Sequence, residues 1–358
     1  MISDLFLKPL SKTEGYQALV QAVEKNIGKT AAVFGLTEGA RTVLAGALSQ
    51  GRRTLVVTPS DQAALRMAED LSRSGVSALH FPARELTFYH MAAESRELVH
   101  RRIAVLGRLL DEQAQVVCAP IEALLIPLMP VKEFRRGIVK LDAGDVVDLD
   151  ELFKLLAEMG YVRQETVEAR GQFAVRGGIL DVYPVQSMTA WRIELFDDEV
   201  DSVRELDVMT QRSQPADEAC VIYPATEAAA DGNALLRAAR ALEAEVKNSG
   251  PVQRTPESEV PWLTDEENEE EDAAPADGTV IRRSSDGSAR SNTIDALKLE
   301  HRPEGLENLI PYLYEKPAFF SDYFDPELVV LDEAGRLRER AVNMGLEFAA
   351  KLENALER

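Results

Sequence analysis

Short apolar runs alternate with helical segments through the first 120 residues, and this alternation is the strongest constraint on the fold. The apolar runs cover residues 31–34, 54–58 and 116–119, and segments with apolar residues at helical spacing follow them over 42–49, 61–73 and 121–129. Strand-like runs separated by helices predict a parallel sheet with helices on both faces. The expected fold class is therefore α/β.

The pattern changes between residues 129 and 210. A helix expected over 150–159 ends at Gly160 and is followed by four short runs: GQFAV, GILDVYP, WRIELF and VDSVREL. Gly177-Gly178 and Asp197-Asp198-Glu199 lie where hairpin turns or bulges would fall between such runs. These features predict a small α+β domain with an antiparallel sheet, inserted into the α/β unit, which resumes with a helix over 228–246.

A polar segment over residues 248–297 separates this helix from the last part of the chain. Within it, residues 256–277 hold ten acidic residues and no basic one. So polar a segment buries too little apolar surface to offset the entropy of ordering it, and we expect a disordered insertion. A solvated spacer is one interpretation, and an acidic decoy that competes with DNA for a basic partner surface is another. The expected units are 1–128, 129–210, 211–247, 248–297 and 298–358.

Composition limits the class of protein. The net charge of -21 argues against a chain that coats nucleic acid, although about half of the excess comes from the one acidic run. No run approaches the roughly 18 apolar residues of a membrane span, and the N-terminus lacks the features of a signal peptide. Two cysteines, Cys118 and Cys220, are too few for a disulfide framework. We expect a cytoplasmic protein that does not bind membranes.

The segment GLTEGART at residues 35–42 is a degenerate phosphate-binding loop. A functional loop reads G-x-x-x-x-G-K-[ST], and here Gly35 and Thr42 fit, whereas Ala40 and Arg41 replace the second glycine and the lysine. The run LVVL followed by Asp332-Glu333 is typical of the strand whose carboxylates hold magnesium-bound water in such enzymes. A nonfunctional nucleotide site, residual nucleotide binding and a chance match all remain open.

Several motifs in order along the chain carry a resemblance to a known family. They are the degenerate GLTEGART, Phe81-Pro82-Ala83, the helix RRIAVLGRLL, GQFAVRGGILDVYP, RIELFDDEVDSVRELD, GLENLIPYLYE and LVVLDE. The chain resembles the N-terminal, UvrB-like region of bacterial transcription-repair coupling factors, the Mfd family. The resemblance implies UvrB-like domains: a degenerate P-loop, RecA-like unit and an inserted domain that binds the repair protein UvrA.

The resemblance also implies which residues contact UvrA. In the UvrB-like pattern the arginine after Gly-Tyr and the arginine of V-R-G face acidic groups of UvrA, which assigns Arg163 and Arg176, with Phe173 beside them. UvrB has a further arginine where this chain has Ala174, and Arg170 is a candidate to replace it. The alternative is that Phe173 belongs to the core and that the arginines are solvated residues of the sheet.

The implied function is recruitment of UvrA to stalled RNA polymerase in nucleotide excision repair, without ATPase activity and without a cofactor in this chain. The resemblance places the modules for RNA polymerase and DNA, with the ATP- and magnesium-dependent translocase, beyond Arg358. It also implies that the stretch 88–95 is too short for the damage-probing hairpin of UvrB. An active P-loop ATPase or helicase lobe acting on damaged DNA is the alternative.

Other residues favour structural roles. The histidines His80, His90 and His100 lack a pattern of metal ligands, and no metal site is expected. Cys118 and Trp191 lie in strand-like runs, and we expect both to pack in the core.

Overall fold

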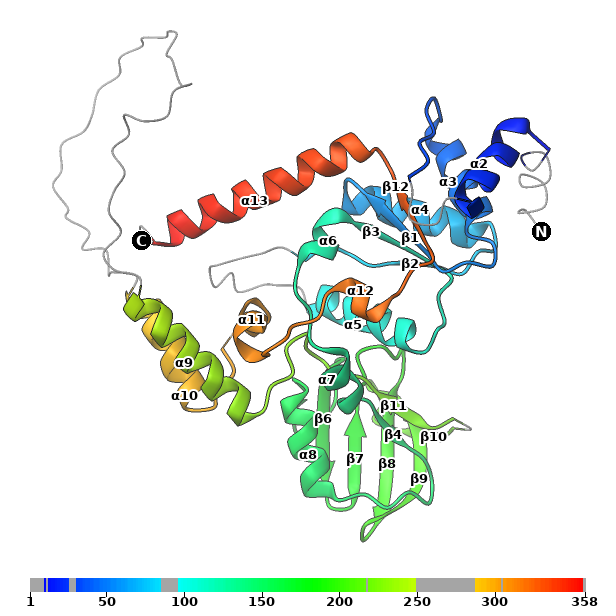
Figure 1. The fold of residues 1–358 in the computed structure, drawn as a ribbon. Coiled ribbons are helices and arrows are strands. Elements are labelled where there is room, and N and C mark those ends of the chain that lie inside the picture. The colour runs from blue at the N-terminus through cyan, green and yellow to red at the C-terminus, as the bar shows by residue number, and fades with distance from the viewer. Residues whose placement is uncertain are drawn as a thin grey trace, which may run out of the picture.

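A computed structural model describes residues 10, 12–25, 30–84, 96–216, 218–248, 287–303 and 305–356. Its first unit is built on a parallel four-stranded sheet in the order β12-β1-β3-β2. The strands are β1 (Thr54–Thr58), β2 (Ala78–His80), β3 (Val116–Pro120) and β12 (Leu328–Leu331). The α/β fold class predicted from the alternation is confirmed (Figure 1).

Five helices belong to the first part of this unit: α2 (Glu14–Lys25), α3 (Glu38–Leu48), α4 (Asp61–Arg73), α5 (Arg96–Leu110) and α6 (Ile121–Leu125). Helix α4 illustrates why they form. The Ser60 side chain caps its first turn by accepting from the Ala63 amide, and apolar residues at helical spacing bury one face against the sheet. Val56 and Cys118 of the central strands lie in that same buried cluster, which confirms the packing role of Cys118.

Three details of this unit differ from the sequence-based prediction. Residues 31–34 form no strand, and their side chains are exposed; Phe34 is 89% exposed, because no described strand lies beside this run to bury it. The helix expected over 121–129 ends at Leu125, two residues before Pro127, whose ring restricts the residue before it. The short strand β2 was not anticipated.

The inserted domain contains a six-stranded sheet in the order β10-β9-β8-β7-β6-β5. Its strands are β5 (Val162–Arg163), β6 (Gln172–Arg176), β7 (Ile179–Val182), β8 (Ala190–Phe196), β9 (Glu199–Leu206) and β10 (Ser213–Pro215). Hairpin turns occur at both predicted places, with Gly177 and Asp197 at positive φ, and β10 lies beyond the boundary predicted at 210. All neighbouring strands are antiparallel except β5 and β6.

Helix α8 (Leu149–Glu158) covers one face of this sheet. Asp148 caps it by accepting from the Glu151 amide, and Gly160, at φ +88°, follows its end as predicted. The ring of Phe153 on α8 stacks on Phe173 of β6 with centroids 6.1 Å apart. On the opposite face the buried apolar residues form a small cluster at one end, made by Val167, Ala174, Ala190 and Leu206, and we call this face the open face.

The remaining elements join the two sheets. They are α7 (Val131–Arg136), β4 (Val139–Leu141), β11 (Cys220–Ile222), α9 (Gly232–Asn248), η2 (Leu306–Leu309), α11 (Ile310–Leu313) and α12 (Phe320–Tyr323). Arg102 of α5 is fully buried at the junction, where it bonds the Glu227 carboxylate and lies 4.2 Å from the Phe81 ring centroid. Helix α9 starts four residues later than predicted because Asp231 caps it through the Ala234 amide.

The last part of the chain corrects the prediction for 248–297. Helix α10 (Gly287–Lys298) lies inside that range and packs on α9, with Ile294 and Leu297 buried, whereas 249–286 lie outside the described residues. The C-terminal helix is α13 (Ala334–Leu356), which buries Leu337 and then extends away from the sheet (Figure 1). Among the described helices, none combines the length and apolarity needed to cross a membrane.

Candidate partner-binding site

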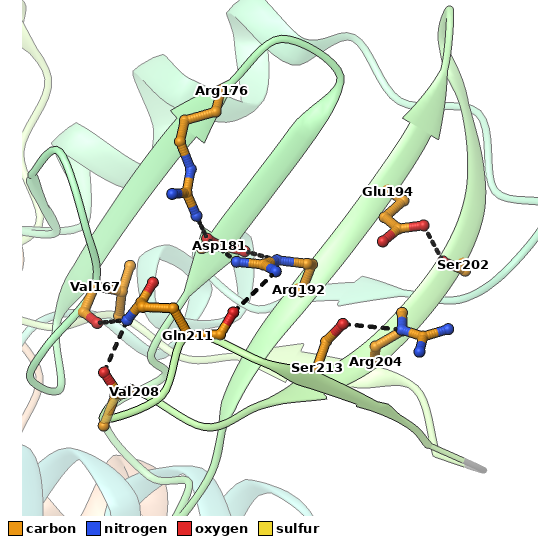
Figure 2. Close-up of polar contacts among 10 residues, drawn as sticks. All are labelled: Val167, Arg176, Asp181, Arg192, Glu194, Ser202, Arg204, Val208, Gln211 and Ser213. Atoms are coloured by element: carbon orange, nitrogen blue, oxygen red, sulfur yellow. Dashed lines mark hydrogen bonds and ion pairs between the residues drawn. The ribbon is translucent and has the colours of Figure 1, made fainter.

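The strand register of the inserted domain fixes which side chains share the open face. Residues paired across antiparallel strands point to the same side of a sheet, and alternate residues along a strand point to opposite sides. One row across the face therefore contains Ala174, Asp181, Arg192 and Arg204, and the next row contains Arg176, Ile179, Glu194 and Ser202. Most of these polar side chains lie together in Figure 2.

Two arginines share one carboxylate at the centre of this face. Asp181 is fully buried and accepts from Arg192 through two bonds, Nε to Oδ1 at 2.6 Å and Nη2 to Oδ2 at 2.8 Å. Arg176 reaches the same carboxylate, with Nη2 2.5 Å from Oδ2, and its side chain is 46% exposed. The Asp181 carboxylate thus faces two arginines (Figure 2), and its single negative charge leaves a surplus positive charge on this pair, of which Arg176 is the more exposed member.

Hydrogen bonds to and from Gln211 hold the arginine cluster in place. Arg192 also donates to the Gln211 carbonyl at 3.3 Å, and the Gln211 amide bonds the carbonyls of Val208 and Val167. The backbone of Gln211 has a positive φ of 56°. Through its contacts with Arg192, Val208 and Val167, Gln211 connects the turn after β9 to the loop before β6. The hydrogen bond to Asp181 is the main reason that the pKa of Arg192 is raised, so this arginine stays charged.

Arg163 lies apart from this cluster. It is the last residue of the edge strand β5 and pairs in register with Phe173. Phe173 points to the face covered by α8, so the register places Arg163 on that side of the sheet edge, whereas Arg176 points to the open face. Arg163 is exposed and has no ion pair with any described residue. A single partner that contacts both arginines must therefore reach around the edge formed by β5 and β6.

Two of the predicted contact residues do not belong to an exposed surface beside Arg176. Phe173 is 3% exposed and packs in the core, so the interpretation as a core residue replaces that of a contact residue. Arg170 lies before the start of β6, at the far end from Arg176. Its guanidinium bonds the Ser187 carbonyl and pairs with Glu97 of α5, and this placement argues against Arg170 as a replacement for the arginine missing at Ala174.

Sequence reasoning missed Asp181 and Arg192, the residues at the centre of the site. The alternation of WRIELF places Arg192 and Glu194 on one side of a strand, and this pattern was a usable signal. The position of Asp181 between the two arginines depends on the pairing of three strands. A single sequence does not give that register.

The degenerate nucleotide site lies at the carboxyl end of the parallel sheet, at the edge formed by β12. Arg41 of α3 contacts both carboxylates that follow this strand, with Nη1 2.7 Å from Asp332 Oδ1 and 3.2 Å from Glu333 Oε1. The hydrogen bond to Asp332 raises the pKa of Arg41. Glu333 adopts a left-handed backbone, with φ +54°, and also pairs with Arg336. The structure thus brings the predicted Arg41, Asp332 and Glu333 together.

The loop in front of α3 has its own capping arrangement. The Thr37 side chain accepts from the Ala40 amide at 3.4 Å and so occupies one of the free amides that a phosphate would use. Thr42 is buried, and its hydroxyl faces the Glu38 carbonyl at 3.5 Å. Gly35 has a positive φ of 78° in an exposed bend, where glycine is favoured.

The remaining singled-out residues have packing or structural contacts. Trp191 is buried, as predicted, and burial raises the pKa of the Cys118 thiol to about 12. His80 contacts Asp61, His100 is buried with its pKa lowered to about 4 by burial, and His90 lies outside the described residues.

Comparisons with known proteins match the inserted domain and the chain as a whole. Residues 139–227 match the UvrB interaction domain family. The chain is 28% identical over 354 residues to a transcription-repair-coupling factor of Bacillus subtilis, covering 97% of this chain and 28% of the relative. It is 26% identical over 330 residues to one of Staphylococcus aureus, covering 91% and 26%. These matches confirm the resemblance to transcription-repair coupling factors, and the chain spans about a quarter of their length.

Proposed function

We propose that this chain is a UvrB-like module of a transcription-repair coupling factor that recruits UvrA through the inserted domain. The observation that carries the proposal is the cluster of Arg176, Asp181 and Arg192 on the open face, within the segment that matches the UvrB interaction domain. Arginine binds carboxylates in a defined geometry and is enriched among residues that dominate interfaces. The surplus positive charge fits an acidic surface of the partner.

The proposal includes no ATP hydrolysis by this chain. Asp332 and Glu333 are the carboxylates that would hold magnesium-bound water, and both are already bonded to Arg41. The residues present thus do not fit a magnesium nucleotide, because an internal cation holds the carboxylates and a threonine caps the helix amides. Neither ATP nor magnesium is part of the proposed function of this chain, which we place in the cytoplasm.

The alternative of an active ATPase or helicase lobe requires Arg41 to leave these carboxylates and bind phosphate. The planar guanidinium is a poor substitute for a compact ammonium group in such a loop. RNA polymerase and DNA are partners of the proposed full-length protein and are assigned no residues of this chain.

Calorimetric titration of purified UvrA into the chain tests the recruitment role. We expect saturable binding, and we expect Arg176→Ala to weaken it by about 1–3 kcal/mol, the range for removing one side of an interfacial charge pair. Arg163→Ala tests whether UvrA reaches around the edge of the sheet. Absence of binding by the well-folded chain would contradict the proposal.

An ATPase assay with and without DNA tests the second part. We expect no turnover above that of the Arg41→Ala variant. Saturable turnover that is lost when Thr42 or Asp332 is changed would support the alternative function instead.

A further inference from the structure

The open face ends in an exposed apolar pair at the turn between β8 and β9. Phe196 is 82% exposed and Val146 is 72% exposed, although both are large apolar residues. Glu199 pairs with Phe196 across the hairpin and with Val146 across an isolated antiparallel bridge. The three side chains therefore form one further row on the same side of the sheet. We call Val146, Phe196, Asp197, Asp198 and Glu199 the hairpin tip.

This row lies next to the row that contains Arg176. Glu194 is two residues before Phe196 on β8 and shares a row with Ile179 and Arg176. A bulge in the pairing follows Glu194, but Leu195 packs into the core and leaves Phe196 on the open side. The arginine cluster and the hairpin tip are thus successive rows of one continuous surface.

The backbone holds the tip in a defined conformation. Asp197 has a positive φ of 60°, which closes the two-residue turn. The adjoining segment is bonded on both sides: the Val147 amide donates to the Asp198 carbonyl, and the Val200 amide donates to the Asp145 carbonyl, each at 2.8 Å. A backbone that is already held in this way loses little conformational entropy on binding.

The charge around the apolar pair has the opposite sign to that of the arginine cluster. Asp197, Asp198 and Glu199 are exposed, and no ion pair engages their carboxylates within the described part of the chain. Asp145 lies beside Val146 and adds a fourth carboxylate to this end. The tip therefore combines an apolar contact with a negative rim, whereas Arg176, in a row that also contains Glu194, offers an exposed positive charge.

We propose that the hairpin tip is an anchor of the same interface, with Phe196 and Val146 entering an apolar pocket of UvrA that is bordered by lysine or arginine. This proposal rests on the proposed function, because the proposed function is what identifies UvrA as the partner. Its support is the continuity of the two rows and the charge around the apolar pair. Aromatic side chains, phenylalanine included, are enriched at the cores of protein interfaces relative to the rest of the surface. A negative rim of this kind disfavours nucleic acid as the occupant.

Titration of purified UvrA into four variants tests the anchor: Phe196→Ala, Arg176→Ala, Met209→Ala and the double variant Asp198→Lys, Glu199→Lys. Met209 is the matched control, because it is 89% exposed on a turn at the opposite end of the sheet. We expect Phe196→Ala to weaken binding about tenfold or more, the lysine variant to weaken it further, and Met209→Ala to leave it unchanged. Thermal melting of each variant should match that of the parent chain.

The outcomes separate the anchor from the proposed function. Weakening by Phe196→Ala, with or without weakening by Arg176→Ala, supports the anchor. Unchanged affinity in Phe196→Ala together with weakening in Arg176→Ala overturns the anchor and leaves the recruitment of UvrA in place. Absence of UvrA binding by the unmodified chain overturns both. Equal weakening by Met209→Ala also overturns the anchor, because the effect would then not depend on the position of the side chain.

Discussion

The two arginine–carboxylate clusters of this molecule differ in the ratio of their charges. At the carboxyl end of the parallel sheet Arg41 contacts both carboxylates, Asp332 and Glu333, and Arg336 also pairs with Glu333, so two arginines face two carboxylates. On the inserted domain two arginines face the single carboxylate of Asp181. In the first cluster Arg41 takes the place that the magnesium ion of a bound nucleotide would occupy. The second cluster leaves a positive charge available to a partner.

The comparison shows that an ion pair alone does not identify a binding site. Each cluster contains an arginine bonded to a carboxylate at 2.5–2.7 Å, and each lies in a region that a family pattern marks as functional. The two clusters differ in the net charge that remains once the ion pairs within each cluster are counted. The predictions below test that distinction, beginning with the largest expected effect.

Replacing Phe173 tests whether the face covered by α8 is core. We expect Phe173→Ala to lower the free energy of unfolding by about 3–5 kcal/mol, because a buried ring stacked on Phe153 is lost and a cavity remains. Urea denaturation measures this loss, and Phe196→Ala is the matched control with little expected change. If Phe173→Ala left the stability unaltered, Phe173 would instead be interpreted as a contact residue for the partner.

Replacing Asp181 leaves two arginines without their shared carboxylate. We expect Asp181→Ala to cost about 2–4 kcal/mol of stability, less than for a fully buried pair because Arg176 is partly exposed. Arg176→Met should cost less than about 1 kcal/mol, because Asp181 keeps its two bonds to Arg192. Similar losses in the two variants would show that Asp181 does not hold the cluster together.

Replacing Asp332 tests the closed cluster in the same way. Arg41 keeps its contact with Glu333, so we expect Asp332→Ala to cost only about 0.5–1.5 kcal/mol in urea denaturation. A loss as large as that of Asp181→Ala would mean that the charge ratio does not distinguish the clusters.

Replacing Arg170 gives the smallest expected change. Its guanidinium is engaged by Ser187 and Glu97, away from the open face, so Arg170→Ala should change the affinity for UvrA by less than about 0.5 kcal/mol. A clear loss of affinity would extend the interface to the loop before β6.

The sequence predicted much of the fold because local signals agreed with tertiary packing. Apolar residues at helical spacing over 61–73 gave α4, Gly160 gave the end of α8, and Asp197 lay in the predicted hairpin turn. Residues 31–34 were misassigned because strand formation depends on a neighbouring strand, which composition does not report. Helix α10 was missed because its buried residues, Ile294 and Leu297, are sparse in a polar segment.

The candidate site was predictable only in part. Arg176 and Arg41 lie in motifs that can be recognised in a single sequence. In the structure Arg41 contacts Asp332 and Glu333, the two carboxylates predicted for the same site. Whether a strand residue points to the helix or to solvent depends on which face is covered, so the resemblance alone did not show that Phe173 is buried and that Phe196 is exposed. The position of Asp181 between two arginines depends on the cross-strand register, which a single sequence does not reveal.

The central claim is that the exposed, surplus positive charge on the open face, and not the presence of arginine–carboxylate pairs, determines UvrA binding. The most direct test compares the affinity of UvrA for two matched charge reversals, Arg176→Glu and Arg41→Glu, by calorimetry at the same salt concentration. We predict that Arg176→Glu weakens binding by at least about 2 kcal/mol, while Arg41→Glu leaves it within about 0.5 kcal/mol of the parent chain. Equal affinities for the two variants, in proteins that melt as the parent does, would contradict the claim.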